Sequence, residues 1–122
     1  MTTNGIVLSQ VQQDQFWRDG YIIVDGAVDP DTLARLRRQM DDWDDESRGH
    51  TEPYGTPTVD GRPRFDMGAE HSPERPALRR INNPCEVSDD FNAVMTDAPM
   101  VDMVADLIGP NVKYHHCKIN TK

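Results

Sequence analysis

The chain has 122 residues, which suits one small domain, and only 36% of them are hydrophobic. A formal net charge of −8 argues against nucleic acid as the main partner and against an anionic membrane surface, because both attract basic proteins. Two cysteines do not make a disulfide framework, and the sequence shows neither a signal segment nor an apolar run of membrane-spanning length, so we expect a cytoplasmic protein.

The first predicted element is a helix that begins at Ser9. Gln12 follows three residues later, which is the capping-box pattern, and Gly20 is a common helix-ending residue. Residues 21–24 read Tyr-Ile-Ile-Val and end at Asp-Gly, so we predict a short strand there. The absence of polar alternation favours a strand that is buried on both faces.

A second helix is predicted to begin with Asp29 as its cap and Pro30 in its first turn. Its apolar residues recur at helical spacing and form one stripe: Leu33, Leu36, Met40 and Trp43. The helix runs into five carboxylates within residues 41–46, which oppose the helix dipole, so we expect this end to fray. A solvated face explains the acidic run better than a metal site does.

Residues 49–76 contain five prolines and four glycines, and no periodicity survives them. We predict a long loop, which in a compact domain is usually functional or disordered. Its larger side chains could face a substrate, or they could pack as in any loop, and the sequence favours neither. They are Tyr54, Phe65, Met67 and His71.

The remaining elements are predicted as a strand at 78–82, a short helix capped by Ser88, a helix capped by Asp97 and an extended segment at 111–122. Gly109 ends the last helix. The fold class is therefore α+β. Three strands are few for a sheet that must cover four helices, so we interpret the sequence as part of a longer chain.

The extended segment 111–122 carries the most conspicuous polar cluster. Because alternate residues of a strand share a face, one face holds Tyr114, His116, Lys118, Asn120 and Lys122. A row of donors suits a pocket for an anion, although an exposed edge strand explains it equally well. His115 and Cys117 share the other face, but a zinc site needs about four ligands and no motif supplies the others.

Three stretches together resemble the N-terminal region of the phytanoyl-CoA dioxygenase family, and they cover most of the chain apart from 49–76. The first contains Leu8, Ser9, Phe16, residues 19–24, Leu33 and Leu36. The second contains residues 80–84, Phe91 and a helix that ends at residues 107–110. The third is the strand from Val112 to Lys122.

This resemblance implies one oxygenase domain, of which residues 1–122 are the N-terminal part: a double-stranded β-helix, or jelly roll, wrapped by N-terminal helices. It also implies iron(II) held by two histidines and a carboxylate, with 2-oxoglutarate as co-substrate. The family's His-x-Asp motif follows this strand, and no such motif occurs here, so we expect neither metal ligands nor catalytic residues within the chain. The chain alone is expected to be poorly folded and inactive.

The resemblance further implies that Lys122 binds 2-oxoglutarate and that His116 contacts substrate. Lys118, Asn120 and Tyr114 would share their face and line the substrate site from the interior of the barrel. The parent would hydroxylate an unactivated carbon of a small molecule, with halogenation as a variant, and the loop 49–76 would cover the substrate entrance. The alternative is a non-catalytic binding module, or a degenerate relative that lacks the metal site.

Overall fold

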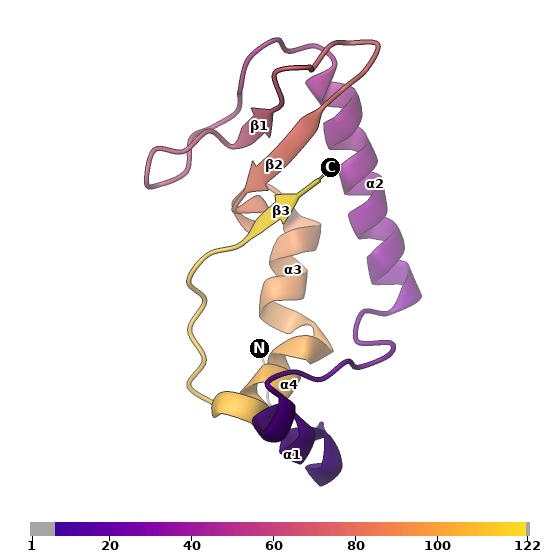
Figure 1. Ribbon diagram of the computed structural model, residues 1–122, viewed down its shortest axis with the longest axis vertical. Helices are drawn as coiled ribbons and strands as arrows, with labels where there is room; N and C mark the ends of the chain where they lie inside the picture. The colour runs from indigo at the N-terminus through magenta and orange to yellow at the C-terminus, as the bar shows by residue number, and fades with distance from the viewer. Residues whose placement is uncertain (1–6, 122) are drawn as a thin grey trace.

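The computed structural model describes residues 7–121. It is an α+β arrangement in which the long helix α2 (Pro30–Ser47) and the helix α3 (Asp89–Asp97) lie against a three-stranded sheet. The helices α1 (Gln10–Asp19) and α4 (Pro99–Ile108) lie together at the end of the molecule away from the sheet (Figure 1). None of the described helices is both long and apolar enough to cross a membrane.

The first helix begins and ends where its capping residues predict. The Ser9 side chain accepts a hydrogen bond from the backbone of Gln12, whose side chain accepts one from the backbone of Ser9. Gly20 closes the helix at φ +85°, a conformation that costs glycine little. The Asp106 carboxylate accepts hydrogen bonds from the backbone N–H groups of Val7 and Leu8, and these bonds tie α1 to α4.

The prediction of a strand at residues 21–24 is wrong. This segment has no regular secondary structure and pairs with none of the described strands. Tyr21 and Ile23 are 59% and 80% exposed. High β propensity mainly reflects packing against neighbouring strands, so it does not create a strand where no partner lies alongside.

The second helix begins as predicted. The Asp29 carboxylate accepts a hydrogen bond from the backbone N–H of Thr32 at 2.8 Å. The helix then continues through the acidic run to Ser47, where the Arg48 guanidinium lies within 4.0 Å of carboxylates on the last turn. This cation offsets part of the repulsion between the carboxylates and the helix dipole. Fraying of this end stays a prediction.

The sheet has the order β1-β2-β3 and both pairings are antiparallel. β2 (Leu78–Asn82) occupies the predicted residues. β1 (Phe65–Met67) lies within the segment that we predicted as loop, and β3 (Lys118–Asn120) is much shorter than the predicted 111–122. The rest of that segment runs extended from α4 back to the sheet without pairing (Figure 1).

The core lies between α2, α3 and one face of the sheet. Its buried residues are Trp43, Phe65, Leu78 and Ile81. The Trp43 ring stacks on that of Phe91 from α3 and meets that of Phe65 edge-on, each at a centroid distance of 5.6 Å. One tryptophan of α2 therefore connects the sheet to α3.

The two short helices confirm one predicted cap and correct another. Ser88 caps α3 by accepting from the backbone N–H of Phe91. α4 is capped by Ala98, which makes no side-chain hydrogen bond, and not by Asp97. Asp97 instead ends α3, and Pro99 begins α4 in the first-turn position that tolerates a missing N–H. Gly109 ends α4 as predicted, at φ +103°.

The predicted alternation is present in β3, while the assignment of its polar face to the inside of a barrel stays a prediction. Ile119 pairs with Ile81 and packs against the core, whereas Lys118 and Asn120 are exposed on the opposite face. Cys117 likewise turns toward the buried Cys85. Alternation therefore groups Lys118 with Asn120 as predicted, and the face of β3 that α2 and α3 cover carries the apolar Ile119.

Candidate functional site

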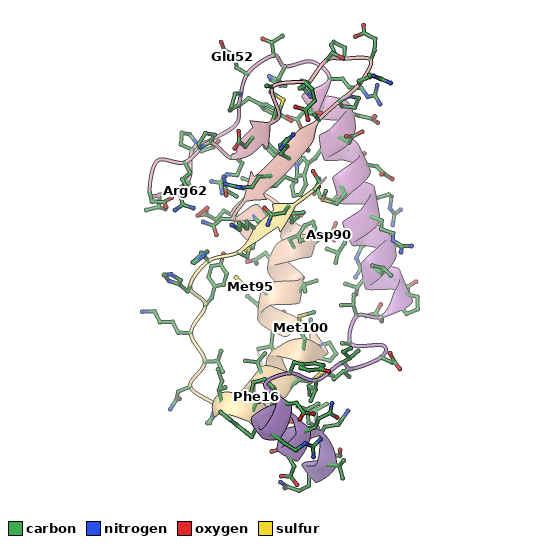
Figure 2. The ribbon with its side chains drawn as sticks, in the orientation of Figure 1. Phe16, Glu52, Arg62, Asp90, Met95 and Met100 are labelled. Atoms are coloured by element: carbon green, nitrogen blue, oxygen red, sulfur yellow. The ribbon has the colours of Figure 1, made fainter. Side chains whose placement is uncertain are left out.

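Two cavities meet at the segment that leads into β3. The larger, of about 650 Å³, lies between α3, α4 and residues 112–117. Figure 2 labels two of its methionines, Met95 on α3 and Met100 at the start of α4. Its apolar lining also includes Phe91, Val94, Val101, Val104 and Val112. The polar atoms at its edge come from Cys85, Thr96, Tyr114, His116 and Cys117.

The smaller cavity, of about 330 Å³, is polar and lies on the other side of the same segment. One wall is the loop that contains Arg62 (Figure 2), and the other is the start of β3 with the turn after β2. Its lining includes Thr58, Asp60, Arg62, Asn82, Asn83, His115, His116, Cys117 and Lys118. His116 and Cys117 line both cavities.

The polar cavity has an excess of positive charge. Asp60 is its one carboxylate and accepts a hydrogen bond from the Thr58 hydroxyl. This bond, aided by Arg62 at 3.2 Å and by His116, lowers the pKa of Asp60 below its ordinary value. Lys118 has no ion-pair partner among residues 7–121. The cavity therefore suits an organic anion, which the ammonium of Lys118 could bind because it is not already in an ion pair.

The structure brings together some, though not all, of the predicted site residues. Tyr114 lines the apolar cavity, Lys118 lines the polar cavity, and His116 borders both. Asn120 lies on the exposed sheet face, paired with Arg80, and lines neither of these cavities. Lys122 lies outside the described residues, so its predicted contact with 2-oxoglutarate stays a prediction.

Arg64 holds the loop wall of the polar cavity, and sequence reasoning missed it. Its side chain is buried and donates to the backbone carbonyls of Thr56, Pro57, Asn82 and Asn83. It also forms an ion pair with Glu86 at 2.6 Å. An arginine among prolines and glycines gives no signal of burial, because its five acceptors come together only after the loop folds back on β2.

Asn83 organises the opposite wall. It adopts φ +46°, a left-handed conformation that asparagine tolerates better than most residues. Its side-chain oxygen accepts hydrogen bonds from the backbone N–H of Cys117 and from the Tyr114 hydroxyl, both at 2.9 Å. Its own N–H donates to the Cys117 carbonyl at 2.8 Å. The available sequence signal was the Asn-Pro pair at residues 83–84, which begins the 3₁₀ turn η1 (Pro84–Glu86).

The side chains of the loop 49–76 that we considered for substrate contact pack inside the protein. Phe65 is buried and stacks on Tyr54, and Met67 packs against the core. His71 Nδ1 accepts from the backbone N–H of Ala77, so its Nε2 carries a proton and donates to the Ser47 carbonyl. Ordinary packing therefore accounts for these four residues. The part of the loop that lines the polar cavity is Thr58, Val59, Asp60 and Arg62.

The hydroxyl of Tyr54 is buried and has no hydrogen-bond partner among the described residues. Burial, together with nearby Glu46, raises its pKa to about 12. We expect Tyr54→Phe to raise the free energy of unfolding by up to about 1 kcal/mol, because a buried polar group without a partner is costly. Urea denaturation measures this change, and Tyr21→Phe, at an exposed tyrosine, should be neutral.

The same tyrosine predicts a pH dependence. The unfolded chain loses the proton near pH 10.0 while the folded chain retains it to about 12, so stability should fall as the pH rises through this window. Tyr54→Phe should lack this part of the fall. A destabilised phenylalanine variant would show that the hydroxyl has a partner.

No described residues form a group of three or more histidine, cysteine, aspartate or glutamate side chains able to hold a metal ion. Comparisons of the chain with family models, with curated proteins and with solved structures each give no match.

Proposed function

We propose that this chain forms one wall of an iron(II)- and 2-oxoglutarate-dependent dioxygenase that hydroxylates an unactivated carbon of a small molecule. The proposal rests on the resemblance of three stretches to the phytanoyl-CoA dioxygenase family and on one structural observation. A sheet covered by helices on one face carries Lys118, Asn120 and Arg80 exposed on the other. In a jelly roll, further strands would extend and close such a sheet.

The described residues do not fit the iron itself, because they supply no three-ligand group. In this proposal the metal ligands come from outside them, and the chain's own residues bind the organic partners. The cationic cavity between residues 58–62 and the start of β3 attracts a carboxylate, since Lys118 is not already paired there. The apolar cavity beyond His116 would receive the less polar part of a substrate.

Lys122 carries the sharpest prediction of this proposal. Lys122→Ala should weaken 2-oxoglutarate binding by about 1.5–3 kcal/mol, roughly tenfold to a hundredfold, because a carboxylate in a closed site loses its charge-assisted bond. Iron binding should change little. Lys122→Arg should restore binding only in part, since the guanidinium is planar and larger. Titration of 2-oxoglutarate into the full-length protein measures the affinities.

A matched control is Lys113→Ala, which removes an exposed lysine from the same segment without touching β3. It should leave the affinity for 2-oxoglutarate unchanged. Equal affinities in wild type and Lys122→Ala would remove the assignment of Lys122 to the co-substrate.

The second candidate is a non-catalytic binding module for an apolar ligand. The apolar cavity of about 650 Å³ favours it, because small-molecule pockets typically have about 300–1,000 Å³. Binding of an apolar fluorescent probe that Val101→Phe weakens, with no affinity for 2-oxoglutarate, would support this function. Val11→Phe, at an exposed position on α1, is the matched control and should leave probe binding unchanged.

A further inference from the structure

The two cysteines lie side by side at the wall shared by the two cavities. The Cys85 Sγ and Cys117 Sγ atoms are 2.9 Å apart, although the residues are separated by 32 positions in the sequence. Both are free thiols. The Tyr114 hydroxyl lies 3.2 Å from the first sulfur and 3.3 Å from the second. A sequence with only two cysteines gives no indication that they meet.

The backbone already holds this pair in place. Cys117 exchanges two hydrogen bonds with Asn83, one through its N–H and one through its carbonyl oxygen. Cys85 follows two residues later, in the 3₁₀ turn η1 that Pro84 begins. Because both thiols sit on segments that Asn83 joins, they can form a bond without a rearrangement of the chain.

The two thiols differ in access. Cys117 is half-buried and lines both cavities, whereas Cys85 is only 9% exposed and lines the apolar cavity alone. Burial, and then the contact with Cys117, raises the pKa of the Cys85 thiol. A small oxidant in the polar cavity therefore meets Cys117 and not Cys85, and in the apolar cavity it meets both thiols, of which Cys117 is the more exposed.

We propose that Cys85 and Cys117 form a redox-responsive disulfide site whose oxidant is a hydroperoxide. The Cys117 thiolate attacks the peroxide, the O–O bond breaks, an alcohol or water leaves, and a sulfenic acid forms on Cys117. The Cys85 sulfur then attacks the Cys117 sulfur, the S–O bond breaks, and water leaves. Together the two thiols lose two electrons and two protons, and the peroxide takes up these electrons and protons as it becomes an alcohol or water plus a second water.

The disulfide would fasten the start of β3 to the turn after β2. It would replace the thiol that lines both cavities with a fixed crosslink beside Tyr114. Closing this long loop should raise the midpoint of thermal unfolding by about 5–15 °C. Reduction with dithiothreitol should reverse the shift. The inference does not depend on the dioxygenase proposal.

Peptide mapping tests the inference directly. Trypsin places Cys85 on the peptide that spans residues 81–113 and Cys117 on the peptide that spans residues 114–118, so a crosslink joins two separate fragments. After treatment with hydrogen peroxide and a thiol-blocking reagent, we expect the joined pair under non-reducing conditions. Its formation should be about tenfold or more faster in native buffer than in urea, because folding supplies the proximity.

Two single variants separate the roles of the thiols. In Cys85→Ser, hydrogen peroxide should oxidise Cys117 about as fast as in the wild type, and dimedone should trap the resulting sulfenic acid. In Cys117→Ser, the buried Cys85 should react at least about tenfold more slowly. The proposal is overturned if wild type gives separate sulfinic acids and no crosslink, if the crosslink forms as fast in urea, or if the two variants react equally.

Discussion

Replacing Arg64 with methionine should lower the free energy of unfolding by about 3–5 kcal/mol. The methionine is of similar length but cannot donate to the four backbone carbonyls that the guanidinium reaches. It also leaves the Glu86 carboxylate without its partner. The free energy of unfolding of Arg64→Lys should lie between those of the wild type and Arg64→Met, because one ammonium cannot reproduce the fork of donors. Urea denaturation measures all three proteins.

The matched control is Arg62→Met, two residues away in the same loop. The Arg62 side chain is 61% exposed and pairs with an equally exposed Asp60, so its loss should cost less than about 1 kcal/mol. Equal destabilisation by Arg62→Met and Arg64→Met would show that Arg64 does not hold this loop against the end of β2.

Trp43→Ala is also expected to lower the free energy of unfolding by about 3–5 kcal/mol. Trp43 is 5% exposed and fills the space between the sheet and α3, so alanine would leave a cavity and break the aromatic contacts with Phe65 and Phe91. The chain offers a second tryptophan as a control. Trp17 is 68% exposed on α1, and Trp17→Ala should cost about 0.5 kcal/mol or less. Similar losses from both variants would contradict the position of the core.

Local signals predicted the elements whose determinants lie within a few residues. The Ser9 capping box, the Asp29 and Ser88 caps and the two helix-ending glycines all act over one helical turn, and each is present in the structure. β2 also lies at the predicted residues 78–82. These features depend little on the rest of the fold.

The failures share a dependence on distant partners. β1 exists because β2 pairs with it, although proline and glycine surround it in the sequence. The β-prone residues 21–24 lack such a partner among the described strands and stay irregular. In β3, alternation correctly groups Lys118 with Asn120, but it cannot reveal which face α2 and α3 cover. Arg64 and the cysteine pair are likewise defined by contacts across the chain.

Our central proposal is that this chain forms part of an iron(II)- and 2-oxoglutarate-dependent dioxygenase whose metal ligands lie outside the described residues. Conversion of 2-oxoglutarate to succinate, measured with and without iron(II), tests it most directly. We expect iron-dependent succinate from the full-length protein and none from the 122-residue chain alone. Succinate production by that chain alone, or a full-length protein that neither binds 2-oxoglutarate nor forms succinate with iron present, would contradict it.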